Sequence, residues 1–462
     1  MCNNENDQHK TYQEDSRIPC RYGIECYQKN PVHHKIYKHP PTEHVKKQII
    51  TKHSKKRKTQ DDRKTKKKNS SEVLNDSQKK KVQKIHDNMT DESIVSTVDN
   101  TANNDDKKIK TTEDVSNSEL AESVNHSVNR ITITSLLKDC NINIESGKLL
   151  PSDAQTVISC LFLTEMPEDF FQFFEFCKSI SKTDPLNALK NLQLQLVGPY
   201  DVFKDDFLSS NVSDKKALLR HWRYYYDPAE FQTVIKIDDK DNLHFGYWRD
   251  DSLEKPVFVA KNKANVNCII EPVAENIFGS VNIYIEEKLK LANPFQKIRI
   301  AQLHQKLRNY AKEKNITLDK QTNSMLVRKK EVVASTFHKA GIVVPYDSKT
   351  EIGYRDLAVT NNELDKILKQ IEQASTSEAK KPPMSKLEEV IRLATIAADE
   401  CDFGTCLELG HDLFSCGVPF VQNKALNMLS VAYNLLQRPQ LLEIARAHLE
   451  DRRRGSNLSV LY

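Results

Sequence analysis

Two neighbouring stretches, Phe231-Gln-Thr-Val-Ile-Lys-Ile237 and Leu243-His-Phe-Gly-Tyr-Trp248, decide the fold of this chain. Both are rich in β-branched and aromatic residues, and Asp, Lys and Asn residues separate them, so we predict two successive strands. Val257–Ala260 is a third candidate strand, and Leu192–Val197 is a fourth, because it alternates at period two before Gly198-Pro199. This order predicts an antiparallel sheet with flanking helices rather than a doubly wound parallel fold.

Helices are predicted on both sides of these strands in the sequence. Met166–Cys177 begins with proline and acidic residues, as helix starts do. Behind Pro382-Pro383, Ser385 and Glu388 form a capping box that marks the start of a further helix. Its apolar face is interpreted as core and consists of Leu387, Val390, Ile391, Ala394, Ala398 and Cys401. Amphipathic stretches follow at Thr405–Phe414, Lys424–Leu436 and Leu441–Leu449. The fold class is therefore α+β, with a mainly helical C-terminal part.

Charge is distributed unevenly in front of this body. The 462 residues carry a net charge of only +5, yet residues 44–84 hold 16 Lys or Arg against 4 Asp or Glu. Residues 85–122 reverse the balance, with 10 acidic against 3 basic residues. Both stretches are nearly free of aromatic residues and cannot bury enough apolar surface to offset the entropy of ordering. We therefore predict a disordered, charged linker over residues 43–130.

The composition also bears on the compartment. No stretch approaches the roughly 20 apolar residues of a membrane span, and the N-terminal residues carry no apolar signal-peptide segment. The ten cysteines show no framework spacing across the body, which favours a reducing compartment. Secretion and membrane association are not expected.

The N-terminal module contains four metal-ligand residues within a short segment. Cys20 and Cys26 are followed by His33 and His39, and two thiolates with two imidazoles are the tetrahedral set that Zn(II) prefers. Such a short segment has no core of its own, so metal binding would supply its folding free energy. The insert between the second Cys and the first His is shorter than in DNA-reading fingers, which house a recognition helix there. A flexible tail with accidental Cys and His is the alternative.

The run from Pro19 to Pro40 resembles the poly(ADP-ribose)-binding (PBZ) zinc finger. The resemblance implies that Tyr22 and Tyr27 cradle an adenine ring, and aromatic faces do stack on bases. Arg21 can answer the pyrophosphate charge. The family usually has arginine where this chain has Gln28, and this departure predicts weaker binding of the polymer. Packing of the tyrosines around zinc is the alternative.

Basic clusters lie in the linker at Lys55–Lys58 and Lys66–Lys68. Such clusters are typical of nuclear import signals and of nucleic-acid contacts. A solvated disordered run would have the same composition, so the clusters alone decide nothing.

The body resembles the histone PARylation factor family over nearly its whole length. The blocks that carry the resemblance are Met166–Cys177, Leu194–Asp201, His221–Thr233, Thr336–Pro345, Gly353–Arg355 and Asp399–Gly404. The domains expected from these signals are a PBZ-type finger at 15–42, the linker at 43–130, an α+β domain at 131–290 and a mainly helical domain at 291–462. The last domain would carry the candidate catalytic carboxylate.

Asp399 and Glu400 fall in the last turn of the predicted helix, off its apolar face, with Asp402 just beyond and Gly404 as the expected stop. Acidic groups oppose the macrodipole at this end of a helix, so something other than helix stability would retain them; chance surface charge is the alternative. The family resemblance implies that Glu400 is the general base of an active site shared with a poly(ADP-ribose) polymerase. It also implies that Asp399 docks on the polymerase, and that Arg355 positions Glu400 or contacts the substrate; a surface ion pair is the alternative for Arg355.

The resemblance implies a nuclear, chromatin-associated cofactor that acts in DNA damage and repair. Its partners would be a polymerase that binds NAD, histones whose serines become modified, and poly(ADP-ribose); nucleic acid could be contacted only through the basic linker. The chain is not expected to be an enzyme alone. Two other functions stay open: a zinc-finger chromatin adaptor without a chemical role, and a stand-alone ADP-ribose hydrolase or transferase. The latter would need a nucleotide-cradling loop, and the 11 glycines form no such motif.

Overall fold

The computed structural model describes residues 15–19, 34–35, 37–39, 130–144, 149–150 and 152–462. The predicted linker therefore lies outside the described residues, apart from Arg130. Two short strands, β1 (Ile18–Pro19) and β2 (Tyr37–Lys38), belong to the N-terminal module. His34 and Lys35 of this module are helical, and the other helices and strands of the described residues lie between Ile131 and Glu450.

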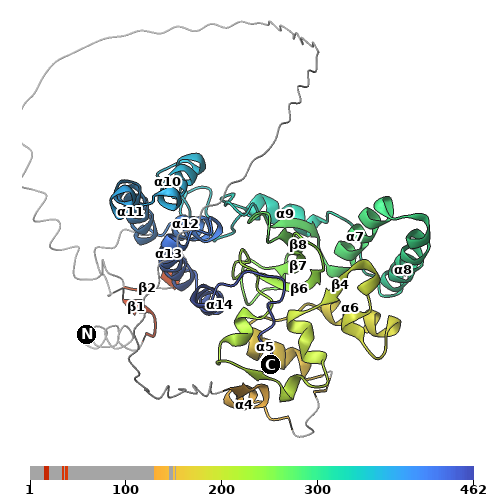
Figure 1. The fold of residues 1–462 in the computed structure, drawn as a ribbon. Coiled ribbons are helices and arrows are strands. Elements are labelled where there is room, and N and C mark those ends of the chain that lie inside the picture. The colour runs from red at the N-terminus through yellow and green to blue at the C-terminus, as the bar shows by residue number, and fades with distance from the viewer. Residues whose placement is uncertain (1–14, 20–33, 36, 40–129, 145–148, 151) are drawn as a thin grey trace, which may run out of the picture. The chain divides into compact units, whose positions relative to one another are not determined.

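An antiparallel sheet of five strands forms the centre of the body (Figure 1). Its order is β4-β6-β7-β8-β9, and every neighbouring pair is antiparallel. The strands are β4 (Leu194–Leu196), β6 (Phe231–Ile237), β7 (Leu243–Trp248), β8 (Phe258–Lys263) and β9 (Glu271–Ala274). The bounds predicted for β6 and β7 are confirmed, whereas β8 runs three residues beyond Ala260 and β9 was not predicted. A smaller antiparallel pair joins β3 (Ile131–Thr132) to β5 (Asn211–Val212).

The two faces of the sheet belong to different apolar clusters, as the period-two geometry of strands requires. On β7, Phe245 and Tyr247 face the largest cluster, while Trp248 faces a smaller one with Phe258. The largest cluster is covered by α4 (Ile133–Asp139), α5 (Ala154–Phe162), α6 (Glu168–Ile180), α7 (Ile277–Leu291) and α8 (Pro294–Glu313). The predicted aromatic helix is α6, with Pro167 as its N-cap.

Most of the C-terminal helices gather on the other side of the sheet in Figure 1, whereas the first of them, α9, lies beside β8. They are α9 (Asn323–Glu331), α10 (Asn361–Gln373), α11 (Ser377–Asp399), α12 (Phe403–Ser415), α13 (Gln422–Leu435) and α14 (Pro439–Glu450). Short 3₁₀ helices occur at Pro185–Asn187, Lys190–Leu192, Gly198–Phe203, Phe207–Ser209, Ala217–Arg220 and Pro419–Val421. Helices α10 to α14 share one apolar cluster that includes most of the predicted face of α11. The α+β class and the helical C-terminal part are thus confirmed, and none of the helices described could span a membrane.

The start predicted for α11 was wrong. The helix begins at Ser377 with Thr376 as its N-cap, so Pro382 and Pro383 lie inside it and Ser385 caps nothing. Proline has no backbone N–H to donate to the preceding turn, and the prolines were therefore read as a boundary. The Thr376 cap and the buried side of α11 hold the first turns helical despite the two lost bonds.

Cys140 and Cys160 form a disulfide that ties the end of α4 to α5. The spacing of the cysteines gave no sign of this pair, because a single bridge within one domain has no characteristic spacing.

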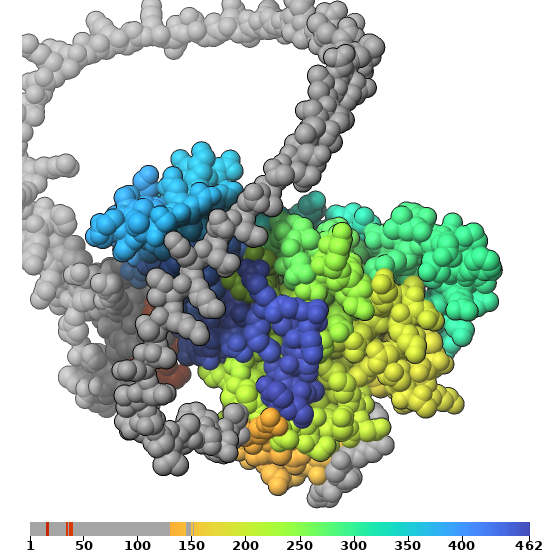
Figure 2. Space-filling model, in the orientation of Figure 1, coloured from red at the N-terminus to blue at the C-terminus, as the bar shows by residue number. Residues whose placement is uncertain are grey.

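Residues after α14 run back over the first half of the body, where dark blue crosses the green surface in Figure 2. Trp222 donates its backbone N–H to the Leu458 carbonyl at 3.1 Å, and Asn211 and Tyr462 exchange backbone bonds of 3.3 and 3.0 Å. The Val460 N–H reaches His221 Nδ1 at 3.1 Å. We call residues 456–462 the C-terminal strap; it completes the surface next to β5.

Candidate functional site

The acidic residues predicted for the site lie at the corner between α11 and α12. Asp399 is the last residue of α11 and is exposed, Glu400 is the C-cap, and Asp402 is the N-cap of α12. The chain turns between them at Cys401, whose φ is +76°. As predicted, Asp399 and Glu400 lie outside the apolar face of the helix.

We predicted that Gly404 ends α11, and this was wrong. Gly404 lies in the first turn of α12. A Cβ at Gly404 would come within 3.0 Å of both the Gly353 carbonyl oxygen and the Val344 side chain. The glycine is thus needed for close packing against the segment that contains Gly353, while the reversal itself occurs at Cys401.

Residues 353–355 are fixed against the start of α12 by hydrogen bonds that their backbone makes with Asp402, Gly404 and Thr405. The Gly404 N–H donates to the Gly353 carbonyl at 2.9 Å, and the Gly353 N–H donates to Asp402 Oδ1 at 2.9 Å. Thr405 Oγ1 donates to the Arg355 carbonyl at 2.7 Å. Gly353 has φ +117°, and a Cβ there would lie 2.1 Å from the Pro345 carbonyl oxygen. Only glycine fits this position, so the segment enters the site along one path.

Arg355 links two of the carboxylates. Its Nε donates to Asp402 Oδ2 at 2.5 Å, and its Nη2 donates to Glu400 Oε2. The side chains of Arg355 and Glu400 are 45% and 40% exposed, whereas that of Asp402 is 9% exposed. Burial alone would lower the pKa of Arg355, but the bonds from Glu400 and Asp402 outweigh it and raise that pKa. Asp402 is the buried anchor of this arrangement, and Glu400 is its exposed end.

Tyr354 contacts two further acids, the buried Glu408 and the exposed Asp356. Its hydroxyl lies 3.0 Å from Glu408 Oε2 on α12 and 3.2 Å from Asp356 Oδ1. A tyrosine hydroxyl has one proton and can donate to only one of them. Burial raises the pKa of Glu408 to about 7, and the charge of Asp356 acts in the same direction against the bond from Tyr354. A protonated Glu408 would satisfy all three groups, by donating to Tyr354 while Tyr354 donates to Asp356.

Sequence reasoning missed Glu408. It also missed Asp412, one turn further on, where burial raises the carboxyl pKa to about 8. Both fall within the stretch Thr405–Phe414, which was read only as an amphipathic helix. The signal was available, because two acids four residues apart stood among mostly apolar neighbours in a segment without Lys or Arg.

Little of the N-terminal module is described. Pro19 pairs with Lys38 in the parallel β1–β2 register, and these residues directly precede the predicted ligands Cys20 and His39. His39 is described and lies 4.6 Å from His34 between ring centroids. The remaining predicted ligands and ADP-ribose contacts lie outside the described residues: Cys20, Cys26, His33, Arg21, Tyr22 and Tyr27. Within the described part of the chain, no three His, Cys, Asp or Glu residues form a metal cluster; the donor chemistry of the full set nevertheless suits zinc.

Comparison with known proteins covers both parts of the chain. The family model described as Histone PARylation factor 1 matches residues 153–452, and the PBZ domain model matches residues 17–42. Histone PARylation factor 1 of Mus musculus is 38% identical over 303 residues, which are 65% of this chain and 87% of the relative. The protein of the same name from Danio rerio is 40% identical over 294 residues, which are 63% of this chain and 84% of the relative. The chain therefore belongs to the histone PARylation factor family and has a PBZ domain at its N-terminal end.

Proposed function

We propose that this protein is an accessory factor of a poly(ADP-ribose) polymerase that supplies Glu400 as the general base of a shared active site. The observation that carries this proposal is the position of Glu400 on an exposed corner. Arg355 contacts Glu400 there and is itself held by the buried Asp402. An exposed carboxylate that is fixed in position can enter the cleft of another protein and act there. This arrangement needs no enclosed pocket in the chain itself.

The chemistry required of Glu400 is the removal of one proton. A serine hydroxyl is a weak nucleophile until a base takes its proton. Its oxygen then forms the bond to the anomeric carbon of NAD held by the polymerase, and the bond to nicotinamide breaks. Glu400 keeps the serine proton and becomes neutral.

The two contacts of Arg355, with Glu400 and with Asp402, are compatible with the loss of negative charge on Glu400. Once Glu400 has taken the proton it is neutral, so its contact with Arg355 weakens. Arg355 does not lose its anchor at that moment, because Asp402 retains the Nε bond of 2.5 Å. Arg355 and Asp402 are therefore positioning residues, and Glu400 is the catalytic residue.

The remaining acidic charge would select partners. Asp399 is exposed beside Glu400 and is proposed to dock on the polymerase. The corner as a whole would attract serines flanked by lysine in histone tails through charge complementarity. Occupation of the polymerase cleft would also hinder the acceptor end of a growing polymer, so that products are short.

The N-terminal part would localise the protein. Zinc held by Cys20, Cys26, His33 and His39 would fold the finger, and Arg21, Tyr22 and Tyr27 would bind poly(ADP-ribose). The basic clusters of the linker would direct the protein to the nucleus and to damaged chromatin. A PBZ domain also favours one other function, that of a polymer-binding chromatin adaptor without a catalytic part.

The deciding experiment compares Glu400→Gln with Glu389→Gln. Both residues are on or next to α11 and pair with an arginine at the surface, but only Glu400 is proposed to act as a base. With a cognate polymerase, NAD and a histone peptide, serine modification at saturating factor should fall about 10²–10⁴-fold for Glu400→Gln and stay unchanged for Glu389→Gln. Normal serine modification by Glu400→Gln would favour the adaptor.

A further inference from the structure

The block Thr336–Pro345 has no part in the function proposed above, yet it forms one wall of a cavity. This cavity has a volume of about 700 Å³ and lies between β8, α9 and the loop 335–341. Its volume is in the range of small-molecule sites, which are about 300–1,000 Å³. Three lysines line it, Lys320, Lys329 and Lys339, and no acidic residue does. We call it the Lys339 cavity.

The three lysines are not neutralised. None of them forms an ion pair with a carboxylate anywhere in the described part of the chain. The fourth cation of the lining, Arg328, is different: its Nε and Nη2 donate to the two oxygens of Asp250 at 3.0 and 2.8 Å. Arg328 is thus a structural part of the wall, and the lysines supply the uncompensated charge.

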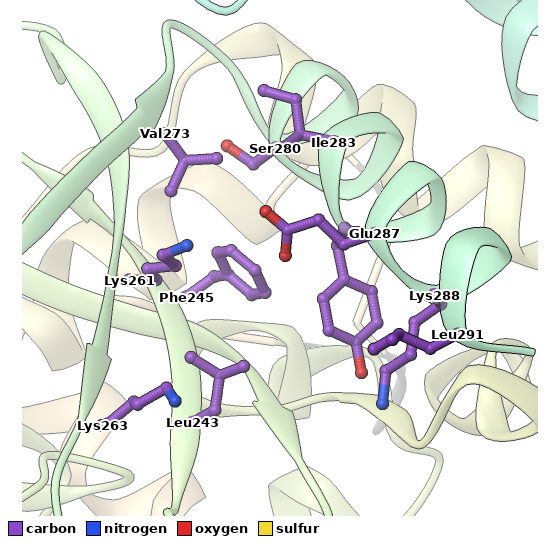
Figure 3. A pocket seen from close by; sticks show the side chains of 11 residues that line it. Leu243, Phe245, Lys261, Lys263, Val273, Ser280, Ile283, Glu287, Lys288 and Leu291 are labelled. Carbon is purple, nitrogen blue, oxygen red and sulfur yellow. The ribbon is translucent and has the colours of Figure 1, made fainter. Parts of the chain in front are cut away.

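A second cavity offers a comparison, because two of its lysines have carboxylate partners. It lies between the sheet and α7 and also contains three lysines (Figure 3). Lys261 pairs with Glu271 at 3.4 Å, Lys263 pairs with Asp241 at 3.1 Å, and Lys288 donates to Gln193 at 3.1 Å. Glu287 also lines this cavity. Two of its three lysines pair with carboxylates and the third donates to an amide, whereas no lysine of the Lys339 cavity has a carboxylate partner among the described residues.

The loop of the Lys339 cavity is rigidly built. The Phe337 N–H donates to Asp412 Oδ1 at 2.7 Å, the Ala340 N–H donates to His338 Nδ1 at 3.2 Å, and Arg328 donates to the Gly341 carbonyl at 3.1 Å. Lys339 itself has φ +65°. This conformation favours glycine and costs energy for lysine, and such costs concentrate at functional sites.

Apart from Gln321 and Ser335, the rest of the lining is apolar. Phe258, Met325 and Val332 line the cavity beside the lysines. Lysine amines bind phosphate as point charges, and an apolar surface accepts the face of an aromatic base. The combination fits a ligand that carries both a pyrophosphate and a base.

We propose that the Lys339 cavity binds the ADP part of ADP-ribose, with the pyrophosphate among Lys320, Lys329 and Lys339 and adenine against the apolar wall. The nucleoside diphosphate class follows from the lining, whereas the choice of adenine rests on the proposed function. The site would hold free ADP-ribose or the end of a polymer, and it is separate from the corner that contains Glu400. It does not require Glu400 to be a base.

The test uses the full-length protein with Tyr22→Ala and Tyr27→Ala, so that the finger does not contribute its proposed adenine contacts. ADP-ribose binding is measured by calorimetry without any polymerase, which separates the result from the catalytic proposal. Lys329→Ala should weaken binding about tenfold, the effect of one lost charge-assisted contact. Lys330→Ala is the matched control, because it removes the same charge from the next residue of α9 and Lys330 does not line the cavity. Equal effects of these two substitutions would overturn the proposal.

Lys339→Gly separates binding from folding. Glycine accepts the left-handed conformation, so the unfolding temperature should not fall, while ADP-ribose binding should weaken about tenfold. Pyrophosphate alone should bind at least about tenfold more weakly than ADP-ribose, because it lacks the base. Equally tight binding of pyrophosphate or of short single-stranded DNA would show a general polyanion surface and refute the proposal. Polymer binding that exceeds ADP-ribose binding and depends on Lys329 would place the polymer end in the cavity.

Discussion

Asp402→Asn should destabilise the protein much more than Glu400→Gln, although both replace a carboxylate that Arg355 contacts. Asp402 is 9% exposed and accepts bonds from the Gly353 N–H and from Arg355 Nε. The side-chain oxygen of asparagine can still accept from the Gly353 N–H, but its NH₂ group would then face the Nε–H of Arg355, and two donors cannot form a hydrogen bond. The loss of a charge-assisted hydrogen bond costs about 1.5–3 kcal/mol, and loss of the anion at the start of α12 adds about 0.3–1 kcal/mol. The expected decrease is therefore about 2–4 kcal/mol.

Glu400→Gln removes an ion pair whose two side chains are 40% and 45% exposed. Exposed pairs contribute about 0.2–1 kcal/mol, and removing a negative charge from the end of α11 offsets part of this loss. Urea unfolding should thus distinguish the two variants clearly, with Asp365→Asn on α10, an exposed partner of Lys369, as a control that changes little. Serine modification should fall for both variants. Glu400→Gln removes the proposed base, and Asp402→Asn removes the contact that holds Arg355 in position beside Glu400. An Asp402→Asn protein as stable as the wild type would mean that the buried contact is absent in solution, and the reasoning would fail.

Three further predictions concern other parts of the chain. Burial raises the pKa of Glu408 from 4.5 to about 7, so Glu408 keeps its proton to a higher pH in the folded state than in the unfolded state. The free energy of unfolding should therefore decrease as pH rises from 4.5 to 7. Glu408→Gln should make this decrease smaller. A peptide of residues 15–45 should bind one zinc and unfold with chelator, as followed by circular dichroism, and Cys26→Ala should abolish both; a fold that persists in Cys26→Ala would exclude the assigned ligands. Asp399→Ala should lower serine modification mainly through weaker association, so a titration should recover activity at high concentration; a defect that persists at saturation would contradict the docking role.

The parts of the fold that follow a local pattern were predictable. Strands β6 and β7 have their predicted bounds because runs of β-branched and aromatic residues, and the turn residues between them, are visible in the local sequence. The start of α11 could not be predicted in this way, since tertiary packing keeps Pro382 and Pro383 helical against their local preference. Gly404 was misread for a related reason: its lack of a side chain serves a contact with Gly353, which is 51 residues away in the sequence.

The candidate site shows the same limit. Local pattern indicated that Asp399 and Glu400 lie off the apolar face of a helix. It could not indicate that Asp402 is buried, that Arg355 bridges it to Glu400, or that Glu408 lies under Tyr354, because each of these contacts joins two distant segments. The roles of the site residues stay predictions.

The C-terminal strap has a consequence for how the chain reaches its native state. The bonds between Trp222 and Leu458 and between Asn211 and Tyr462 close loops of more than 230 residues, and His411 reaches Glu230 over a separation of 181 residues. Contacts of such long sequence separation slow folding. During synthesis, the region around Trp222 would emerge well before its last partners and would stay incompletely covered until they follow. We therefore expect chaperones in the cell to bind this region before the chain is complete. A substitution in the strap should lower the yield of folded protein more than it lowers the activity of the folded molecules.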